Sequence, residues 1–182
     1  CAHKWVDLSE GDYGVALLND CKYGYDTLDD QVSLTLMKSP RAPDEKADIG
    51  EHTFTYALFP HEGPFTAETV VREAYALNAP LYAVPHKEGN GTLRALDFCK
   101  VSNPNVIVEA VKKAEADDAA IVRLYEAGNT RGDVTVSFGR SVKKVYACNL
   151  MEENTESIKA RNDDVTVAMM PFEIKTLMVY FK

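Results

Sequence analysis

Residues 165–181 read VTVAMMPFEIKTLMVYF, two runs of alternating side chains separated by a proline. In the first run, Val165, Val167 and Met169 occupy every second position, and residues 172–181 alternate in the same way. A period of two is typical of β-strands that place one face in a core. The end of the second run is apolar at both parities, so we expect both of its faces to be covered.

The same alternation recurs along most of the chain. Turn-forming segments separate the runs, one at residues 39–44 with a proline near each end and one at residues 129–133. The spacing of strands and turns over residues 100–182 predicts an antiparallel β-sandwich. The further strands that we expect cover residues 15–18, 32–36, 52–58, 106–110, 121–125 and 134–138.

One segment has a helical period instead. Apolar residues recur at intervals of three and four between residues 66 and 78, which predicts a helix packed on a sheet. Thr66 is suited to the N-cap, and Pro80 ends the helix. Residues 81–84 predict a short strand or an extended return. A polar segment at residues 85–100 follows, and we place a domain boundary at residue 97, which gives domains 1–97 and 98–182.

Composition and charge exclude several classes of protein. The chain has 182 residues, 46% of them hydrophobic, which is enough for a core. No apolar run approaches the ~20 residues that span a bilayer. The chain has 20 basic and 28 acidic residues, which gives a net charge of −8. We therefore expect neither a nucleic-acid nor a membrane partner. The pairs Lys112-Lys113 and Lys143-Lys144 are interpreted as solvated faces.

The cysteines and the first residue bear on the compartment. None of the four cysteines has CxxC spacing, so we expect reduced thiols in a cytoplasmic protein. The chain begins at Cys1 and shows no secretory signal, and we expect it to be part of a longer protein. The sequon Asn90-Gly91-Thr92 is therefore given no weight.

No constellation of residues predicts catalysis or metal binding. His52 and His61 lie nine positions apart, but zinc needs three converging ligands, and Gly50 and Phe54, which share the strand face of His52, cannot serve. The sequence contains no GxSxG, GxGxxG or Walker A motif. Adjacent acidic pairs point to opposite strand faces or lie in turns, which does not suit a glycosidase dyad: Asp29-Asp30, Asp117-Asp118, Glu152-Glu153 and Asp163-Asp164.

A polar and aromatic cluster follows the apolar strand at residues 15–18. It contains Asn19, Asp20, Lys22, Tyr23 and Tyr25. Such a mixture suits a sugar, because polar groups bind hydroxyls while aromatic rings stack on CH faces. It equally suits a tight turn whose Asn and Asp side chains satisfy the backbone. Both interpretations stay open at this point.

Several long segments together resemble glycoside hydrolase family 38, the α-mannosidase family, and its cytosolic and vacuolar class and bacterial relatives in particular. The resemblance covers essentially the whole chain. It is carried by three longer segments, Trp5–Glu10, Gly14–Asp26 and Ala47–His61. Shorter similar segments follow in the same order as in the family, at Arg123–Ala127, Asn149–Glu153 and Pro171–Thr176.

The resemblance implies a non-catalytic C-terminal piece of a retaining α-mannosidase that hydrolyses terminal α-mannosyl residues of oligosaccharides. Family members are large, and their N-terminal α/β domain carries the zinc ligands and the aspartate nucleophile. Zinc is thus implied for the parent enzyme, with no cofactor in these residues. The implied fold is mainly β: the end of a mutarotase-like β-supersandwich with one helix over residues 1–97, then a small antiparallel β-sandwich over residues 98–182.

Partners and site residues follow from the same resemblance. The partners would be the N-terminal catalytic part of the same protein and α-mannoside substrates, and homo-oligomer formation stays open. We expect Asn19, Asp20, Lys22, Tyr23 and Tyr25 to lie near the substrate cleft, with Asp48 and His52 as a second choice. The alternatives are an independent carbohydrate-binding β-sandwich module and, if the cluster proves buried and self-satisfied, a plain interaction module.

Overall fold

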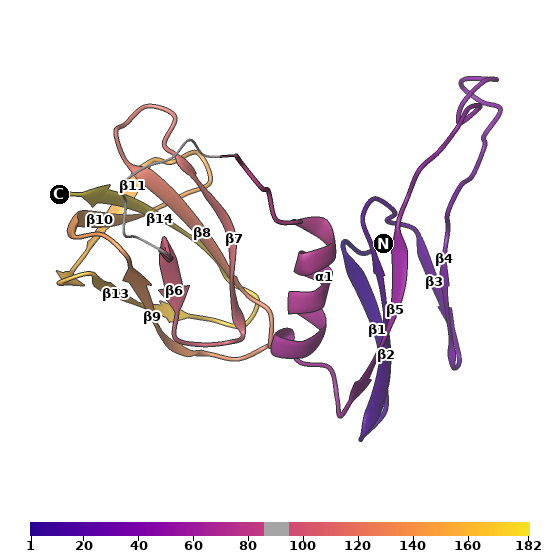
Figure 1. Cartoon of the computed structure of the whole chain (residues 1–182), viewed down its shortest axis with the longest axis horizontal. Helices are drawn as coiled ribbons and strands as arrows, with labels where there is room; N and C mark the ends of the chain where they lie inside the picture. The colour runs from indigo at the N-terminus through magenta and orange to yellow at the C-terminus, as the bar shows by residue number, and fades with distance from the viewer. Residues whose placement is uncertain (86–94) are drawn as a thin grey trace. The chain divides into compact units, whose positions relative to one another are not determined.

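The computed structural model describes residues 1–85 and 95–182, without the side chains of residues 154 and 155. It divides into two compact units, residues 1–85 and 86–182 (Figure 1). The division at residue 97 stays a prediction, and the Asn90-Gly91-Thr92 sequon lies outside the described residues.

The first unit is built on a three-stranded antiparallel sheet of order β1-β2-β5. Its strands are β1 (Trp5–Ser9), β2 (Tyr13–Asn19) and β5 (Tyr56–Glu62). The expected strand at residues 52–58 begins only at Tyr56, because its pairing partner β2 ends at Asn19, opposite Tyr56. A separate hairpin joins β3 (Tyr25–Leu28) to β4 (Gln31–Leu34), where we expected a strand at residues 32–36.

The predicted helix is confirmed as a helical segment from residue 67 to residue 78. It starts with one π-helical turn, η1 (Ala67–Val71), and continues as α1 (Arg72–Asn78). Thr66 is the N-cap, and its Oγ1 accepts the backbone N–H of Thr69 at 3.2 Å. Of the two alternatives for residues 81–84, a short strand or an extended return, the strand is wrong: Leu81 is fully exposed, and the segment pairs with no strand of the described residues.

The helical segment covers one face of the three-stranded sheet (Figure 1). Ala16 and Leu18 of β2 pack there against Val70 and Ala74, within a cluster completed by Trp5, Ala57, Phe59, Phe65 and Leu77. The opposite face of the sheet is also apolar but solvent-exposed. Three large side chains on it are 42–70% exposed: Leu8, Tyr56 and Leu58.

The second unit is a sandwich of two antiparallel sheets, as predicted. A five-stranded sheet of order β11-β10-β14-β8-β7 faces a four-stranded sheet of order β12-β13-β9-β6, and the core between them holds apolar residues of both. The strands are β6 (Cys99–Val101), β7 (Val106–Lys113), β8 (Ala120–Glu126), β9 (Gly132–Phe138), β10 (Val142–Cys148), β11 (Asn154–Ile158), β12 (Ala160–Arg161), β13 (Asp164–Met169) and β14 (Ile174–Phe181).

The most central strand, β14, is covered on both faces, as its sequence predicts. Leu177 and Val179 lie in the inter-sheet core, while Met178 packs in a separate cluster with Ile121 on the other side of the sheet. Strand β10 had no alternating signature, because a register shift between Val142 and Lys144 breaks its period of two. No helix among the described residues is long and apolar enough to cross a membrane.

Candidate functional site

Asn19 organises the turn that follows β2. Its side chain is buried, and its Nδ2 donates a hydrogen bond to the hydroxyl of Tyr25 at the start of β3. Its Oδ1 accepts the backbone N–H of Lys22 at 2.6 Å, and its own backbone N–H donates to the carbonyl of Lys4 at 3.0 Å. The amide of Asn19 is therefore used within the fold, as buried polar groups usually are.

Asp20 ties the same turn to the segment that enters β5. The backbone N–H of Thr55 donates to Asp20 Oδ1 at 3.0 Å, and the backbone N–H of Asp20 donates to the carbonyl of Thr55 at 3.2 Å. The Thr55 N–H stabilises the charged form and so lowers the pKa of the Asp20 carboxyl. The side chain of Asp20 is otherwise exposed.

The end of the helical segment reaches the same point. Asn78, the last residue of α1, donates from Nδ2 to the carbonyl of Asn19 at 3.0 Å and to the carbonyl of Ala74 at 2.8 Å. The second bond fastens the Asn78 side chain to the carbonyl of Ala74 in the last helical turn. Sheet, turn and helix thus meet at Asn19.

The remaining members of the cluster, Tyr25, Tyr23 and Lys22, differ in how far their side chains are exposed to solvent and in what they contact. Tyr25 is half-buried, and its burial raises the pKa of its hydroxyl. Tyr23 is 53% exposed, with the ring of His3 at 4.8 Å between centroids. The ammonium of Lys22 lies 4.7 Å from the centre of the Phe54 ring, a cation–π geometry.

The structure brings the five predicted site residues into one turn. Asn19 and Tyr25 are engaged with each other, and Asp20 has one oxygen engaged by the backbone. The ring of Tyr23 and the carboxylate of Asp20 are exposed and are the groups of the cluster best placed to meet a ligand from solvent, whereas Lys22 is half-buried over the Phe54 ring. Their contact with substrate stays a prediction.

The second-choice residues, Asp48 and His52, lie in an exposed loop where His52 Nε2 is 2.9 Å from the backbone carbonyl of Asp48. His61 is engaged elsewhere, by Asp7. Within residues 1–85 and 95–182, no three His, Cys, Asp or Glu side chains are grouped so that they could hold a metal ion.

Sequence reasoning missed two buried polar centres. One is the pair of Asp7 and His61, whose nearest side-chain N and O atoms are 2.8 Å apart. The other is Glu126, which is 2% exposed and accepts hydrogen bonds from two separate loops. Both centres lie in segments that carry the family resemblance, and this resemblance was the only sign in the sequence that could have pointed to them. No spacing rule links residues as far apart in sequence as Asp7 and His61.

Comparison with known proteins identifies the chain. Residues 1–46 match the model of the glycosyl hydrolases family 38 C-terminal domain, and residues 105–177 match that of the family 38 C-terminal beta sandwich domain. Alpha-mannosidase G of Dictyostelium discoideum is 40% identical over 181 residues, which cover 96% of this chain and 16% of that protein. The chain belongs to glycosyl hydrolase family 38. The resemblance seen in the sequence is thereby confirmed, and the matched models place the chain in the C-terminal region of the family.

Further family 38 relatives agree. Alpha-mannosidase 2C1 of Mus musculus is 38% identical over 98% of this chain and 18% of its own length. An alpha-mannosidase of Saccharomyces cerevisiae is 31% identical over all of this chain and 19% of its own length. The chain therefore spans less than a fifth of these curated relatives.

A solved structure supports the fold. A family 38 protein from Enterococcus faecalis superimposes with a TM-score of 0.77 at 20% identity, covering 98% of this chain and 22% of that one. An identity this low bears on fold alone. Together with the strands above, it confirms the mainly β class with one helical segment that the sequence predicts.

Proposed function

We propose that this family 38 chain is the non-catalytic C-terminal part of a retaining α-mannosidase that removes terminal α-mannosyl residues from oligosaccharides. The observation that carries the proposal is the 38–40% identity to two α-mannosidases over nearly the whole chain. In the proposed assembly, the partners are the catalytic part of the same protein and the α-mannoside substrate.

The bare face of the first unit supports a structural role. Leu58 is 70% exposed and Leu8 42% exposed on a sheet whose other face is already covered by the helical segment. Exposed apolar groups gathered on one face are typical of a surface that another part of a protein covers. We propose that further parts of the mannosidase pack there and that the Asn19–Tyr25 turn helps to wall the substrate cleft.

Zinc belongs to the parent enzyme in this proposal. The described residues do not group three ligands of the His, Cys, Asp or Glu type, and the proposal assigns zinc to none of them.

Activity assays test the proposal directly. The chain alone and the full-length product of its gene are assayed with 4-nitrophenyl α-mannoside, with and without added zinc, and with the β-mannoside as substrate control. We expect zinc-dependent α-specific hydrolysis by the full-length protein only, and retention of the anomeric configuration in its first product by NMR. Zinc-dependent turnover by the chain alone would contradict the proposal that this chain is non-catalytic.

The exposed ring of Tyr23 favours one alternative, an independent carbohydrate-binding module. That function requires saturable binding of mannobiose to the isolated chain, lost in Tyr23→Ala. A calorimetric titration that shows no binding at high protein concentration would exclude this alternative.

We further propose a cytoplasmic location for the protein. Fractionation of the source cells with a cytoplasmic and a vesicular marker tests it.

A further inference from the structure

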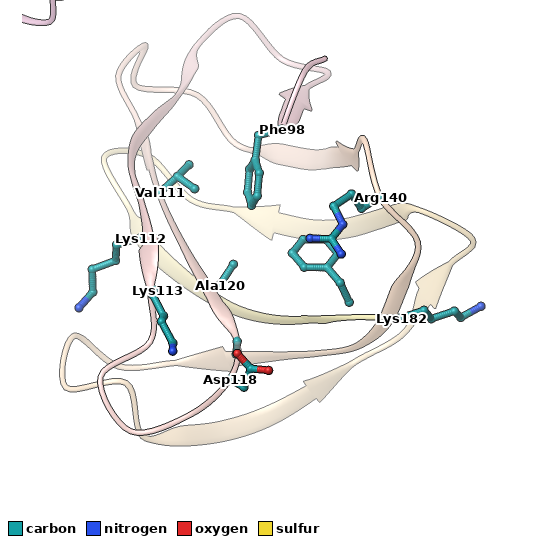
Figure 2. A pocket seen from close by; sticks show the side chains of 10 residues that line it. Phe98, Val111, Lys112, Lys113, Asp118, Ala120, Arg140 and Lys182 are labelled. Atoms are coloured by element: carbon teal, nitrogen blue, oxygen red, sulfur yellow. The ribbon is translucent and has the colours of Figure 1, made fainter. Parts of the chain in front are cut away.

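The sandwich of the second unit has a hollow at one end, with a volume of about 640 Å³ (Figure 2). Its walls come from strand ends that meet there: β7 ends at Lys113, β8 begins at Ala120 and β14 ends at Phe181. Phe98 precedes β6 and Arg140 follows β9 on the facing sheet. Small-molecule sites typically have volumes of roughly 300–1,000 Å³, so the hollow has the size of a site for a small molecule.

Aromatic rings form the apolar part of the hollow. Phe98 lies edge-to-face with Phe181, with ring centres 5.8 Å apart, and edge-to-face with Phe138 at 6.3 Å. Phe98 is 37% exposed, so part of its ring is open to a ligand (Figure 2). Mutual edge-to-face packing holds these rings in place and offers a preformed surface for another ring.

The polar part of the hollow is cationic. Four basic side chains and a single carboxylate, that of Asp118, line it, although acidic residues outnumber basic ones in the whole chain, 28 to 20. The guanidinium carbon of Arg140 lies 5.4 Å from the centre of the Phe181 ring, which orients it at the hollow.

Two of these cations have no anionic partner among the residues that the structure describes. Lys112 is paired with Glu152 at 2.7 Å and with Glu115. In contrast, Lys113 and Arg140 form no ion pair with the residues that the structure describes. Unpaired cations on an acidic protein, beside a low-dielectric aromatic surface, attract an anion more strongly than scattered surface lysines do.

We propose that this hollow binds a small phosphate monoester carried on a ring. The ring packs against Phe98 and Phe181, and the phosphate is held between Arg140 and Lys113. Two unpaired cations match the charge of a phosphate dianion, and the guanidinium fork of Arg140 suits two phosphate oxygens. The hollow contains no residue of the Asn19–Tyr25 turn.

Calorimetric titration of the isolated chain tests the proposal with phenyl phosphate, glucose 6-phosphate, inorganic phosphate and phenol. We expect saturable binding of at least one ring phosphate, at least about fivefold tighter than inorganic phosphate because stacking adds to the ion contacts. Phenol should not bind measurably. Which of the two ring phosphates binds tighter tells an aryl ligand from a sugar phosphate. Absence of binding by both, or equal affinity for inorganic phosphate, overturns the proposal.

Substitutions locate the site. Arg140→Gln and Lys113→Gln should each weaken ring-phosphate binding about fivefold or more. Arg131→Gln is the matched control, since Arg131 is exposed in the same unit and the whole of β9 separates it from Arg140. It should change affinity less than about twofold, since exposed charges beyond a Debye length are screened. Thermal melts check that each variant is folded. If Arg131→Gln loses as much ring-phosphate affinity as Arg140→Gln, or if Arg140→Gln loses none, the assignment of the binding site to this hollow is overturned.

Discussion

His61 and Asp7 form a buried pair across the three-stranded sheet, with Nε2 and Oδ1 2.8 Å apart although strand β2 runs between their own strands. The pair closes over Gly14 of β2, which is aligned with His61 in the sheet. A Cβ built at Gly14 would lie 2.5 Å from the imidazole ring. The missing side chain of Gly14 is therefore what lets two edge strands exchange a side-chain hydrogen bond.

We predict that Gly14→Ala destabilises the first unit. The methyl group has to displace the imidazole and break its bond to Asp7, because Ser9 also lies within 2.7 Å of the new atom. We expect the free energy of unfolding to fall by about 1–3 kcal/mol. The single tryptophan, Trp5, lies on β1 of this unit, so its fluorescence in a urea titration reports the change.

Gly11→Ala provides the control for this substitution. No atom lies within 4 Å of a Cβ built at Gly11, so we expect a change below about 0.5 kcal/mol. Equal effects of the two substitutions would mean that helix or strand propensity, and not the His61 contact, decides the outcome at Gly14.

The pair also makes stability depend on pH. The hydrogen bond to Asp7 raises the pKa of His61 above its ordinary value, with burial opposing. Because the folded pKa exceeds the unfolded one, this stabilisation is complete below about pH 6.5 and is lost as the pH rises through the folded pKa. We expect the advantage of the native chain over His61→Gln, measured by Trp5 fluorescence, to shrink between pH 6 and pH 9. A difference that stays constant over this range would contradict the raised pKa.

The sequence predicts elements here better than contacts between them. Alternation identified β8, β9, β13 and β14, and Thr66 with the helical period identified the helical segment. These signals are local, since burial of one face imposes a period on neighbouring residues. The bond between Asp7 and His61 spans 54 positions and depends on strand register, which no local pattern encodes.

The same limit applies to the contacts of charged side chains. Lys143 and Lys144 are exposed, as the sequence predicts, but the ammonium of Lys144 also lies 4.0 Å from the centre of the Tyr180 ring on the adjacent strand, a contact that no local pattern encodes. In the turn after β2, the sequence left sugar binding and backbone satisfaction open. The structure shows Asn19 satisfying the backbone, a distinction that requires knowing which atoms face each other.

A third prediction concerns Glu126, which joins two loops of the sandwich. Its Oε1 accepts the backbone N–H groups of Gly128 and Thr130 at 2.8 and 3.0 Å, and its Oε2 accepts that of Phe172 at 3.0 Å. Phe172 has a φ of 56°, so this bond supports a left-handed residue. Glu126→Gln replaces one acceptor by a donor, and we expect the free energy of unfolding, followed by circular dichroism in urea, to fall by about 1–3 kcal/mol at pH 7.

At acid pH, the native chain and Glu126→Gln should differ less in their free energy of unfolding than they do at pH 7. Burial alone raises the pKa of Glu126, but the hydrogen bonds from Phe172, Thr130 and Gly128 outweigh it and hold the pKa below its ordinary value. The carboxylate therefore stabilises the fold above about pH 4.3 and stops doing so as the pH falls through its lowered pKa. Glu156→Gln, at an exposed position of β11, is the control and should be neutral at both pH values. A loss in Glu126→Gln that is as large at acid pH as at pH 7 would contradict this linkage.

The last prediction separates the structural from the binding members of the predicted site. Asn19→Ala leaves the Lys22 N–H and the Tyr25 hydroxyl without their partner in a half-buried turn, so we expect the free energy of unfolding to fall by about 1–3 kcal/mol. Tyr23→Ala removes a ring that is 53% exposed and should change it by less than about 0.5 kcal/mol. Trp5 fluorescence in urea measures both. If the full-length protein is the α-mannosidase proposed above and the ring of Tyr23 contacts substrate, Tyr23→Ala should raise its KM for an α-mannoside without lowering Tm. An unchanged KM would leave Tyr23 outside the substrate site, and a Tyr23→Ala loss of stability equal to that of Asn19→Ala would make the whole turn structural.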